Sequence, residues 1–225
     1  MNWPLLVADN FYSGIDTLRE YAKTQEYSPG INFPGARTEP IHEINNNLFQ
    51  GIALKTLALL YPNDYRNISF SATSYLQRVP PNLIDGWVHV DQDSQITSIL
   101  YLNQDINAGT SLFKPVVPFP DINHYTYDKR SYLQIVNSGD KISKKEEDHY
   151  KLIRDENNKQ FKKTCFINSE YNRCVMFDAM EYHAAENFYS RSKEDRYTYI
   201  TFWHELWHEK KQINPNLSTS QRVVP

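Results

Sequence analysis

The pattern of apolar and polar positions divides the chain into a helical beginning and a longer β-rich part. Residues 3–8 form a short apolar run that predicts a strand. Apolar side chains recur at helical spacing in residues 15–26 and again in residues 45–61, so we expect two helices there. Ser13, followed three residues later by Asp16, resembles a capping box at the start of the first helix. Because each helix presents one apolar stripe, both are expected to support a sheet.

From residue 67 the spacing changes to that of β-strands. Runs rich in aromatic and β-branched residues predict strands over residues 68–79, 87–90, 95–103, 110–113, 172–177, 184–188 and 196–203. A turn at residues 107–110 is expected to join the strand before it to a partner strand that begins at Thr110. Short strands with close turns predict a mainly β fold with flanking helices. The expected architecture is a jelly-roll-type sandwich or barrel and not a parallel sheet.

Residues 114–171 interrupt this pattern of strands. Three prolines mark an irregular segment, and Ser143 with Glu146 then predicts a capping box that opens a charged helix ending near Asp155. Two interpretations follow from the length and polarity of the segment. It is either an insertion near the mouth of a site, where it would select substrate, or a solvated surface excursion.

Length and charge favour a single domain that does not bind nucleic acid. The 225 residues are enough for one substantial core. We divide the chain into a helical support (residues 1–66), a β core (67–205) that contains the insertion, and a C-terminal tail (206–225). Within the tail, residues 212–225 are expected to be loosely held. The formal charge of −3 does not favour nucleic acid as a partner.

The sequence predicts a cytoplasmic protein. Its amino terminus lacks the basic and long apolar regions of a signal peptide, and no run approaches the roughly 18 apolar residues of a membrane helix. The two cysteines, Cys165 and Cys174, are too few for a disulfide framework and could pair only if their strands are adjacent. Reduced thiols in a cytosolic protein are therefore expected.

A candidate metal site begins in residues 87–90. If these residues form a strand, His89 and Asp91 project from the same face, because side chains alternate between faces. An imidazole and a carboxylate held in this way supply two of three ligands, and His183 is the candidate for the third. Two His and one carboxylate on one side of an octahedron leave three positions open, which is the arrangement of non-haem Fe(II) oxygenases.

A candidate site for a carboxylate follows in the strand predicted at residues 196–203, where Arg196 and Thr198 share a face. The guanidinium can bind a carboxylate through a charge-assisted bidentate pair, and the hydroxyl can add one hydrogen bond.

In this order, His89-x-Asp91, His183 and Arg196-x-Thr198 resemble the signature of the 2-oxoglutarate/Fe(II)-dependent dioxygenase superfamily. The stretches around these motifs, at residues 98–103, 108–113 and 173–178, are most similar to its prolyl-4-hydroxylase-like branch. The resemblance covers residues 67–205 with a gap in the middle. It implies a double-stranded β-helix (jelly roll or cupin-like) core with N-terminal supporting helices.

The resemblance also implies the cofactors and the roles of the site residues. The triad would hold Fe(II), Arg196 and Thr198 would hold the far carboxylate of 2-oxoglutarate, and O2 would be the second cosubstrate, with ascorbate as an optional reductant. Tyr101 and Tyr75 lie on strands expected to line the pocket, and each either donates its phenol to the oxoglutarate or packs in the core. Ala108 stands where the family commonly has a Gly-Gly pair, and many prolyl hydroxylases have Lys where this chain has Arg196.

The activity implied is hydroxylation of a C–H bond in a peptide, amino-acyl or amino-acid substrate, with release of succinate and CO2. The expected partner is therefore a small molecule or a peptide, with neither nucleic acid nor membrane involved.

Two other functions remain open at this point. One is a non-catalytic, cupin-like module that binds a metal or an anion. The other is a zinc hydrolase, because His204-Glu205-Leu206-Trp207-His208 matches His-Glu-x-x-His, which on a helix places two imidazoles one turn apart with a general base.

Overall fold

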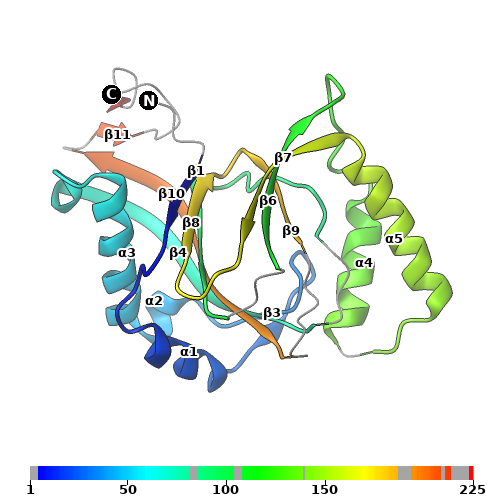
Figure 1. The fold of residues 1–225 in the computed structure, drawn as a ribbon, viewed down its shortest axis with the longest axis horizontal. Coiled ribbons are helices and arrows are strands. Elements are labelled where there is room, and N and C mark those ends of the chain that lie inside the picture. Colours follow the sequence, from blue (N-terminus) through cyan, green and yellow to red (C-terminus); the bar gives the residue numbers. More distant parts are fainter. Residues whose placement is uncertain are drawn as a thin grey trace.

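Two antiparallel sheets and two groups of helices make up the described part of the protein (Figure 1). The computed structural model describes residues 5–81, 86–103, 108–138, 140–186 and 194–208, together with the backbone alone of residues 211–213 and 223–224.

The larger sheet has the strand order β1-β8-β5-β10-β4-β3-β2. Its strands are β1 (Leu5–Ala8), β2 (Ser28–Pro29), β3 (Ala36–Arg37), β4 (Ile68–Val79), β5 (Ile96–Tyr101), β8 (Cys174–Asp178) and β10 (Arg196–His208). β4 has the predicted bounds, whereas β2 and β3 lie in a Pro- and Gly-rich stretch that has the composition of a loop. The predicted start of the last strand is confirmed, but β10 continues past Trp203 to His208 and pairs with β11 (Lys211–Ile213), which pairs in turn with β12 (Val223–Val224).

The smaller sheet has the order β7-β6-β9 and consists of β6 (Gly109–Pro115), β7 (Phe161–Asn168) and β9 (Tyr182–Glu186). This arrangement corrects two predictions. β6 does not pair with β5, the strand before it, but crosses to the other sheet and pairs with β7 and β9. The interruption of the strand pattern is also shorter than residues 114–171, because β6 runs to Pro115 and β7 returns at Phe161.

Helices α1 (Ile15–Lys23), α2 (Ile41–Ile44) and α3 (Asn46–Leu60) cover the outer face of the larger sheet, and the 3-10 turn η1 (Tyr65–Asn67) leads into β4. The two predicted helices are confirmed, but the capping box at Ser13 and Asp16 is wrong. The N-cap of α1 is Gly14, and no side chain caps it. α3 is capped instead by Asn45, whose side chain accepts a hydrogen bond from the Leu48 amide.

The alternation of β10 determines which side chains face the helices and which face the space between the sheets. Tyr199 and Trp203 are almost fully buried against α1 and α3, and the Trp203 indole N–H donates to Ser98 Oγ at 3.1 Å. The alternate residues Thr198 and Ile200 line a cavity on the other face. One strand therefore contributes both to the core and to the cavity.

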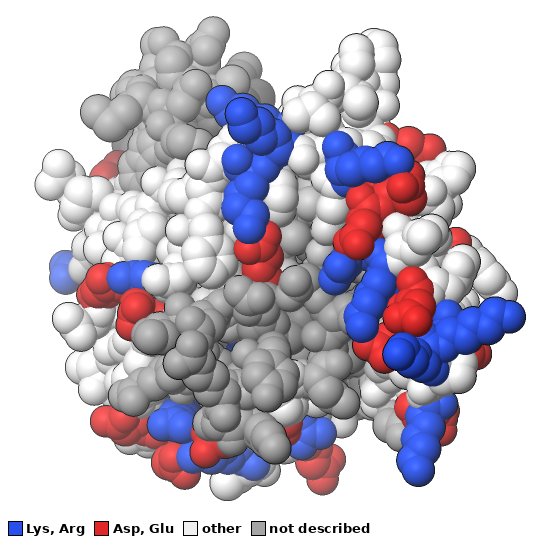
Figure 2. Space-filling view, turned by 45° about the vertical axis from the view of Figure 1, so that its right-hand side comes forward, with Lys and Arg blue, Asp and Glu red and all other residues white. Residues whose placement is uncertain are grey.

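The segment between β6 and β7 contains two helices, α4 (Thr126–Asn137) and α5 (Lys144–Asn158), which lie beside the smaller sheet (Figure 1). The capping box of Ser143 and Glu146 is confirmed at the start of α5. Acidic and basic side chains are intermixed on the surface in this region (Figure 2). The inner residues of both helices pack against Trp87 and Val79, so the segment is part of the fold.

In the described residues, no helix has both the length and the apolar character needed to span a membrane. Cys165 and Cys174 are free, since they lie on strands of different sheets.

Candidate metal centre

The segment from Gly86 to Asp91 runs beside β9 without forming a regular strand, which corrects the strand predicted at residues 87–90. It pairs with β9 through one isolated antiparallel bridge between His89 and His183. The His89 amide donates to the His183 carbonyl at 3.0 Å, and the His183 amide donates to the His89 carbonyl at 2.9 Å. The Gly86 amide donates to Ala185 O at 2.7 Å. The bridge therefore joins the backbones of two candidate ligands that are distant in the sequence.

The three candidate ligands converge. Ligand atoms of His89, Asp91 and His183 all lie within 4.8 Å of one another, and this is the metal-ligating group of three found in the described residues. Nε2 of His183 is 3.4 Å from Asp91 Oδ2, and Nε2 of His89 is 3.8 Å from Asp91 Oδ1. Neighbouring ligands of an octahedral ion with bonds of about 2.1 Å lie about 3 Å apart. A small contraction would therefore place all three around one cation.

Hydrogen bonds fix which imidazole nitrogen faces that point. Nδ1 of His89 lies 2.8 Å from the Trp87 carbonyl oxygen, and Nδ1 of His183 lies 2.8 Å from the Glu181 carbonyl oxygen. A carbonyl can only accept, so both Nδ1 atoms are the donors. In the neutral rings both Nε2 atoms then carry a lone pair toward Asp91, as metal ligands require.

The electrostatics keep the site in the protonation state that binds a cation. Burial of His89, with smaller effects from His183 and Lys129, lowers its pKa from 6.5 to about 3. Burial alone would raise the pKa of Asp91, but its interactions with the two imidazoles and a hydrogen bond from the Thr97 hydroxyl hold that pKa below its ordinary value. At neutral pH the site therefore presents an uncharged His89 imidazole and a carboxylate.

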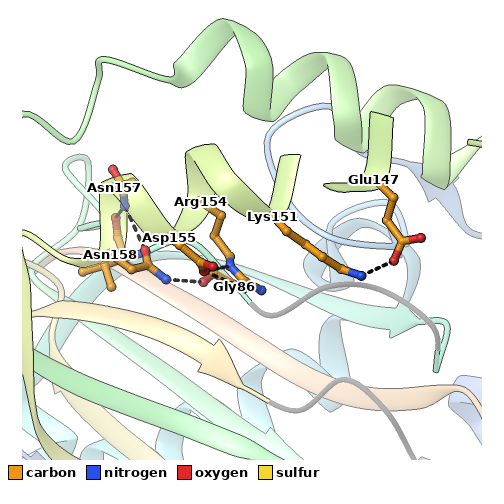
Figure 3. A network of polar contacts seen from close by, with 8 residues as sticks. Gly86, Glu147, Lys151, Arg154, Asp155, Asn157 and Asn158 are labelled. Atoms are coloured by element: carbon orange, nitrogen blue, oxygen red, sulfur yellow. Dashed lines mark hydrogen bonds and ion pairs between the residues drawn. The ribbon is translucent and has the colours of Figure 1, made fainter. Parts of the chain in front are cut away.

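The end of α5 holds the other edge of the Gly86–Asp91 segment. Asn158 Oδ1 accepts a hydrogen bond from the Val88 amide at 2.9 Å, and its Nδ2 donates to the Gly86 carbonyl at 3.1 Å (Figure 3). Asn157, which is buried, donates to the Val88 carbonyl at 3.3 Å. Two side-chain amides thus take the place of a neighbouring strand, a role for residues 157 and 158 that no sequence motif indicates.

A cavity of about 600 Å³ opens in front of the three ligands. Arg196 and Thr198 line it from the start of β10, and both are buried. The Arg196 guanidinium lies 5.4 Å from the centroid of the Tyr101 ring. Tyr101 is buried behind this position, with its hydroxyl 2.7 Å from Thr110 Oγ1, and burial raises its pKa. Tyr75 lines the cavity from β4.

Arg37 and Lys129 also line the cavity, and sequence reasoning missed both. Arg37 lies in the Pro- and Gly-rich stretch before α2, and Lys129 lies in the segment between β6 and β7. Neither is part of a motif with recognisable spacing, so no sequence signal marked them. Arg37 reaches the site because β3 pairs with β4, and Lys129 reaches it because α4 lines the same cavity.

The His-Glu-x-x-His sequence does not form the helical site that it would need for zinc. Residues 204–208 belong to β10, with a register shift between Trp203 and Glu205. His204 contacts Thr73 Oγ1 and the Asp93 carbonyl, whereas His208 pairs with Asp64. The two imidazoles therefore have separate partners and share no ligand position.

Solved structures with a similar fold were found at low sequence identity. HygX from Streptomyces hygroscopicus, solved with nickel and 2-oxoglutarate bound, is 12% identical with a TM-score of 0.55 over 89% of this chain and 82% of that chain. SnoK, a non-haem α-ketoglutarate-dependent carbocyclase from nogalamycin biosynthesis, is 9% identical with a TM-score of 0.55 over 97% and 84%. A prolyl hydroxylase in complex with a hypoxia-inducible-factor peptide from Trichoplax adhaerens is 12% identical with a TM-score of 0.50 over 89% and 83%.

This likeness establishes the fold as a double-stranded β-helix with flanking helices, as predicted. It does not single out the prolyl-hydroxylase-like branch, because HygX and SnoK have higher TM-scores than the prolyl hydroxylase. A comparison with curated proteins finds no match. A protein-family profile matches residues 1–188, a range that includes the three candidate ligands and ends before Arg196. Since the match spans most of the sequence, the chain belongs to DUF6445, a family of unknown function.

Proposed function

We propose that this protein is an oxygenase that uses Fe(II) and 2-oxoglutarate. The observation that carries the proposal is the convergence of His89, Asp91 and His183, with both imidazole Nδ1 atoms bonded to backbone carbonyls. The fold neighbours include enzymes that use a non-haem metal and 2-oxoglutarate, which supports the same assignment. The proposal treats residues 1–225 as one oxygenase domain.

In this proposal His89 and His183 bind the metal through Nε2, and Asp91 binds it through its carboxylate. The Thr97 hydroxyl, which donates to Asp91 Oδ2 at 2.5 Å, keeps the carboxylate oriented. Iron with oxoglutarate and O2 supplies the oxidising power to break a C–H bond. The contribution of the chain is to hold the three ligands on one side, so that the cavity side is left for cosubstrate and substrate.

Arg196 and Thr198 would bind the far carboxylate of oxoglutarate. The buried guanidinium offers a planar pair of donors, and the hydroxyl adds a third. Tyr101 would support Arg196 from behind, through its ring and its hydrogen bond to Thr110, while a direct bond from Tyr75 to the cosubstrate stays a prediction.

We propose hydroxylation as the reaction, on a peptide, amino-acyl or amino-acid-like substrate. The neighbours include an epimerase and a carbocyclase, so epimerisation and cyclisation are the alternative reactions. Mass spectrometry of a converted substrate separates them. Hydroxylation adds one oxygen atom, cyclisation removes two hydrogens, and epimerisation leaves the mass unchanged.

The test begins with the metal and cosubstrate. Anaerobic addition of Fe(II) and 2-oxoglutarate to the full chain should give a weak charge-transfer absorption in the visible, and admission of air should then produce succinate. His89→Ala should abolish both signals, whereas His42→Ala, at an exposed position on α2, should retain them. A wild-type protein that binds metal but gives neither absorption nor succinate would instead be the cupin-like binding module.

A further inference from the structure

Two cations besides Arg196 line the interior of the cavity, and neither comes from β10. Arg37 comes from β3 and Lys129 from the first turn of α4, and both side chains are half-buried. The Arg196 guanidinium lies over Tyr101 of β5, whereas the Arg37 guanidinium lies 3.9 Å from the centroid of the Phe33 ring. The Arg37 guanidinium also lies 5.1 Å from the centroid of the Phe202 ring on β10. Arg37 therefore contacts aromatic rings other than Tyr101, the ring that Arg196 contacts.

Among the described residues that line the cavity interior, cations outnumber carboxylates. Among the described lining residues, Asp91 is the one interior carboxylate, and it faces three cations: Arg37, Lys129 and Arg196. Asp93 and Arg130 line the exposed rim, where their charges offset each other. Fe(II) and 2-oxoglutarate carry equal and opposite charges, so loading both would not change the charge balance among these described residues. The outer surface near α5, in contrast, intermixes both signs (Figure 2).

Neither Arg37 nor Lys129 has a paired carboxylate in the described part of the chain. Arg37 Nε donates to the neutral Gln77 Oε1 at 3.2 Å. Asp91 acts on both cations at longer range. Burial lowers the pKa of Arg37 to about 10 and also lowers the pKa of Lys129. Burying a cation without an adjacent anion costs free energy, and a bound anion would reduce this cost for both Arg37 and Lys129.

Several aromatic side chains also line the cavity: Phe33, Tyr75, Trp87, Tyr125 and Phe202. A volume of about 600 Å³ lies within the range of small-molecule sites. The combination selects a compact ligand with an apolar body and one charged end, since an internal peptide segment would bring a neutral backbone to Arg37 and Lys129.

We propose that Arg37 and Lys129 form a substrate subsite for an oxyanion, a carboxylate or a phosphate, carried on a small apolar body. That the bound anion is a substrate rests on the proposed function, because the subsite would present it to the metal centre. Binding of the anion itself requires neither metal nor oxoglutarate, so the two proposals can fail separately.

The test is a calorimetric titration of the metal-free full chain with three probes: 3-phenylpropionate, its neutral analogue 3-phenylpropionamide, and phenyl phosphate. At least one anion should bind about tenfold or more tightly than the amide, and the better anion identifies the group. Lys129→Met should abolish this preference, and Lys129→Arg should keep most of it because the charge remains. Lys145→Met, which removes an exposed charge from α5, is the matched control and should behave as wild type.

Several results would overturn the subsite. These are equal binding of amide and anions, no binding of either anion at about 10 mM, or an unchanged preference in Lys129→Met. If Lys129→Met fails to fold, Arg37→Gln takes its place, and an unchanged preference for the anion in that variant would overturn the subsite. Displacement of the probe by oxoglutarate in the Ni(II)-loaded protein would also overturn it, because the two cations would then belong to the cosubstrate site. Intact probe binding without the Fe(II)–oxoglutarate absorption would overturn the proposed function alone.

Discussion

Asn158, at the end of α5, accepts a hydrogen bond from the backbone amide of Val88, one residue before the candidate ligand His89. Its side chain also donates to the Gly86 carbonyl, so a single amide holds two points of the segment that carries His89 and Asp91 (Figure 3). Helix α5 is therefore connected to the segment of the metal centre by hydrogen bonds.

Asn158→Ala should loosen this segment. The Val88 amide would lose its partner, and an unsatisfied buried donor costs about 1–3 kcal/mol. We expect a lower midpoint of thermal unfolding and, since ligand orientation depends on such supports, a loss of about 10- to 100-fold in Ni(II) affinity measured by calorimetry. Asn47→Ala, on the exposed surface of α3, should change neither. A variant with reduced stability but unchanged Ni(II) affinity would mean that the bridge to His183 alone positions His89.

His183→Ala and His204→Ala separate the two metal sites that the sequence suggests. Loss of His183 removes one of three converging ligands, so Ni(II) and Fe(II) binding should weaken by more than about 100-fold. His204 contacts Thr73 and the Asp93 backbone, and its removal should leave metal affinity within about threefold of wild type. Zinc binding that depends on His204 and not on His183 would revive the hydrolase hypothesis.

Arg196→Met should weaken oxoglutarate binding without removing the metal. A bidentate pair with a carboxylate contributes about 3 kcal/mol, so the oxoglutarate concentration that half-saturates the charge-transfer absorption should rise about 100-fold. Thr198→Val removes a single hydrogen bond to the cosubstrate and should raise the half-saturating oxoglutarate concentration about fivefold. Arg66→Met, at an exposed position before β4, serves as the control. An unchanged half-saturation in Arg196→Met would mean that another cation anchors the cosubstrate.

Acid should destabilise the metal-free protein through His89. Its pKa in the folded chain is about 3, below the ordinary value of 6.5, so between these values the unfolded chain binds more protons and stability falls as the pH is lowered. The denaturant midpoint should therefore drop between about pH 7.5 and pH 5. His89→Gln should show a smaller drop. Asp91 does not contribute in this window, because its depressed pKa matters only near and below 3.8. Equal drops in both proteins would show that His89 is not the group responsible.

Much of the fold could be predicted from local patterns. β4 occupies the predicted residues because it is long, aromatic and bounded by turn residues, and the capping box of Ser143 and Glu146 marks the start of α5. The partner of β6 could not be predicted in this way. A turn before a strand indicates a hairpin with the preceding strand, β5. In the structure β6 pairs instead with β7 and β9 of the second sheet, which are distant in the sequence.

In the candidate site too, some features could be predicted from the sequence and others could not. His89, Asp91 and His183 carry a motif with fixed order, and the structure brings them together. Their support could not be predicted, since residues 86–91 have the alternation of a strand yet are held by Asn157 and Asn158, which look like ordinary helix-end residues. Arg37 was equally hidden, because its position depends on a tertiary contact between β3 and β4.

Gly86→Ala provides a test of how tightly this segment must lie against β9. A Cβ atom at Gly86 would meet the Ala185 carbonyl oxygen at 2.7 Å and its nitrogen at 3.0 Å, and these backbone atoms cannot move aside as a side chain would. The segment must then shift, breaking the Gly86 to Ala185 hydrogen bond, so we expect lower stability and weaker Ni(II) binding. Gly51→Ala is the matched control. A Cβ there meets nothing within 4 Å, and because Gly51 lies inside α3 the change should stabilise the protein by up to about 1 kcal/mol. Ni(II) affinity unchanged in Gly86→Ala would show that the close approach to β9 is not needed to place His89 and Asp91.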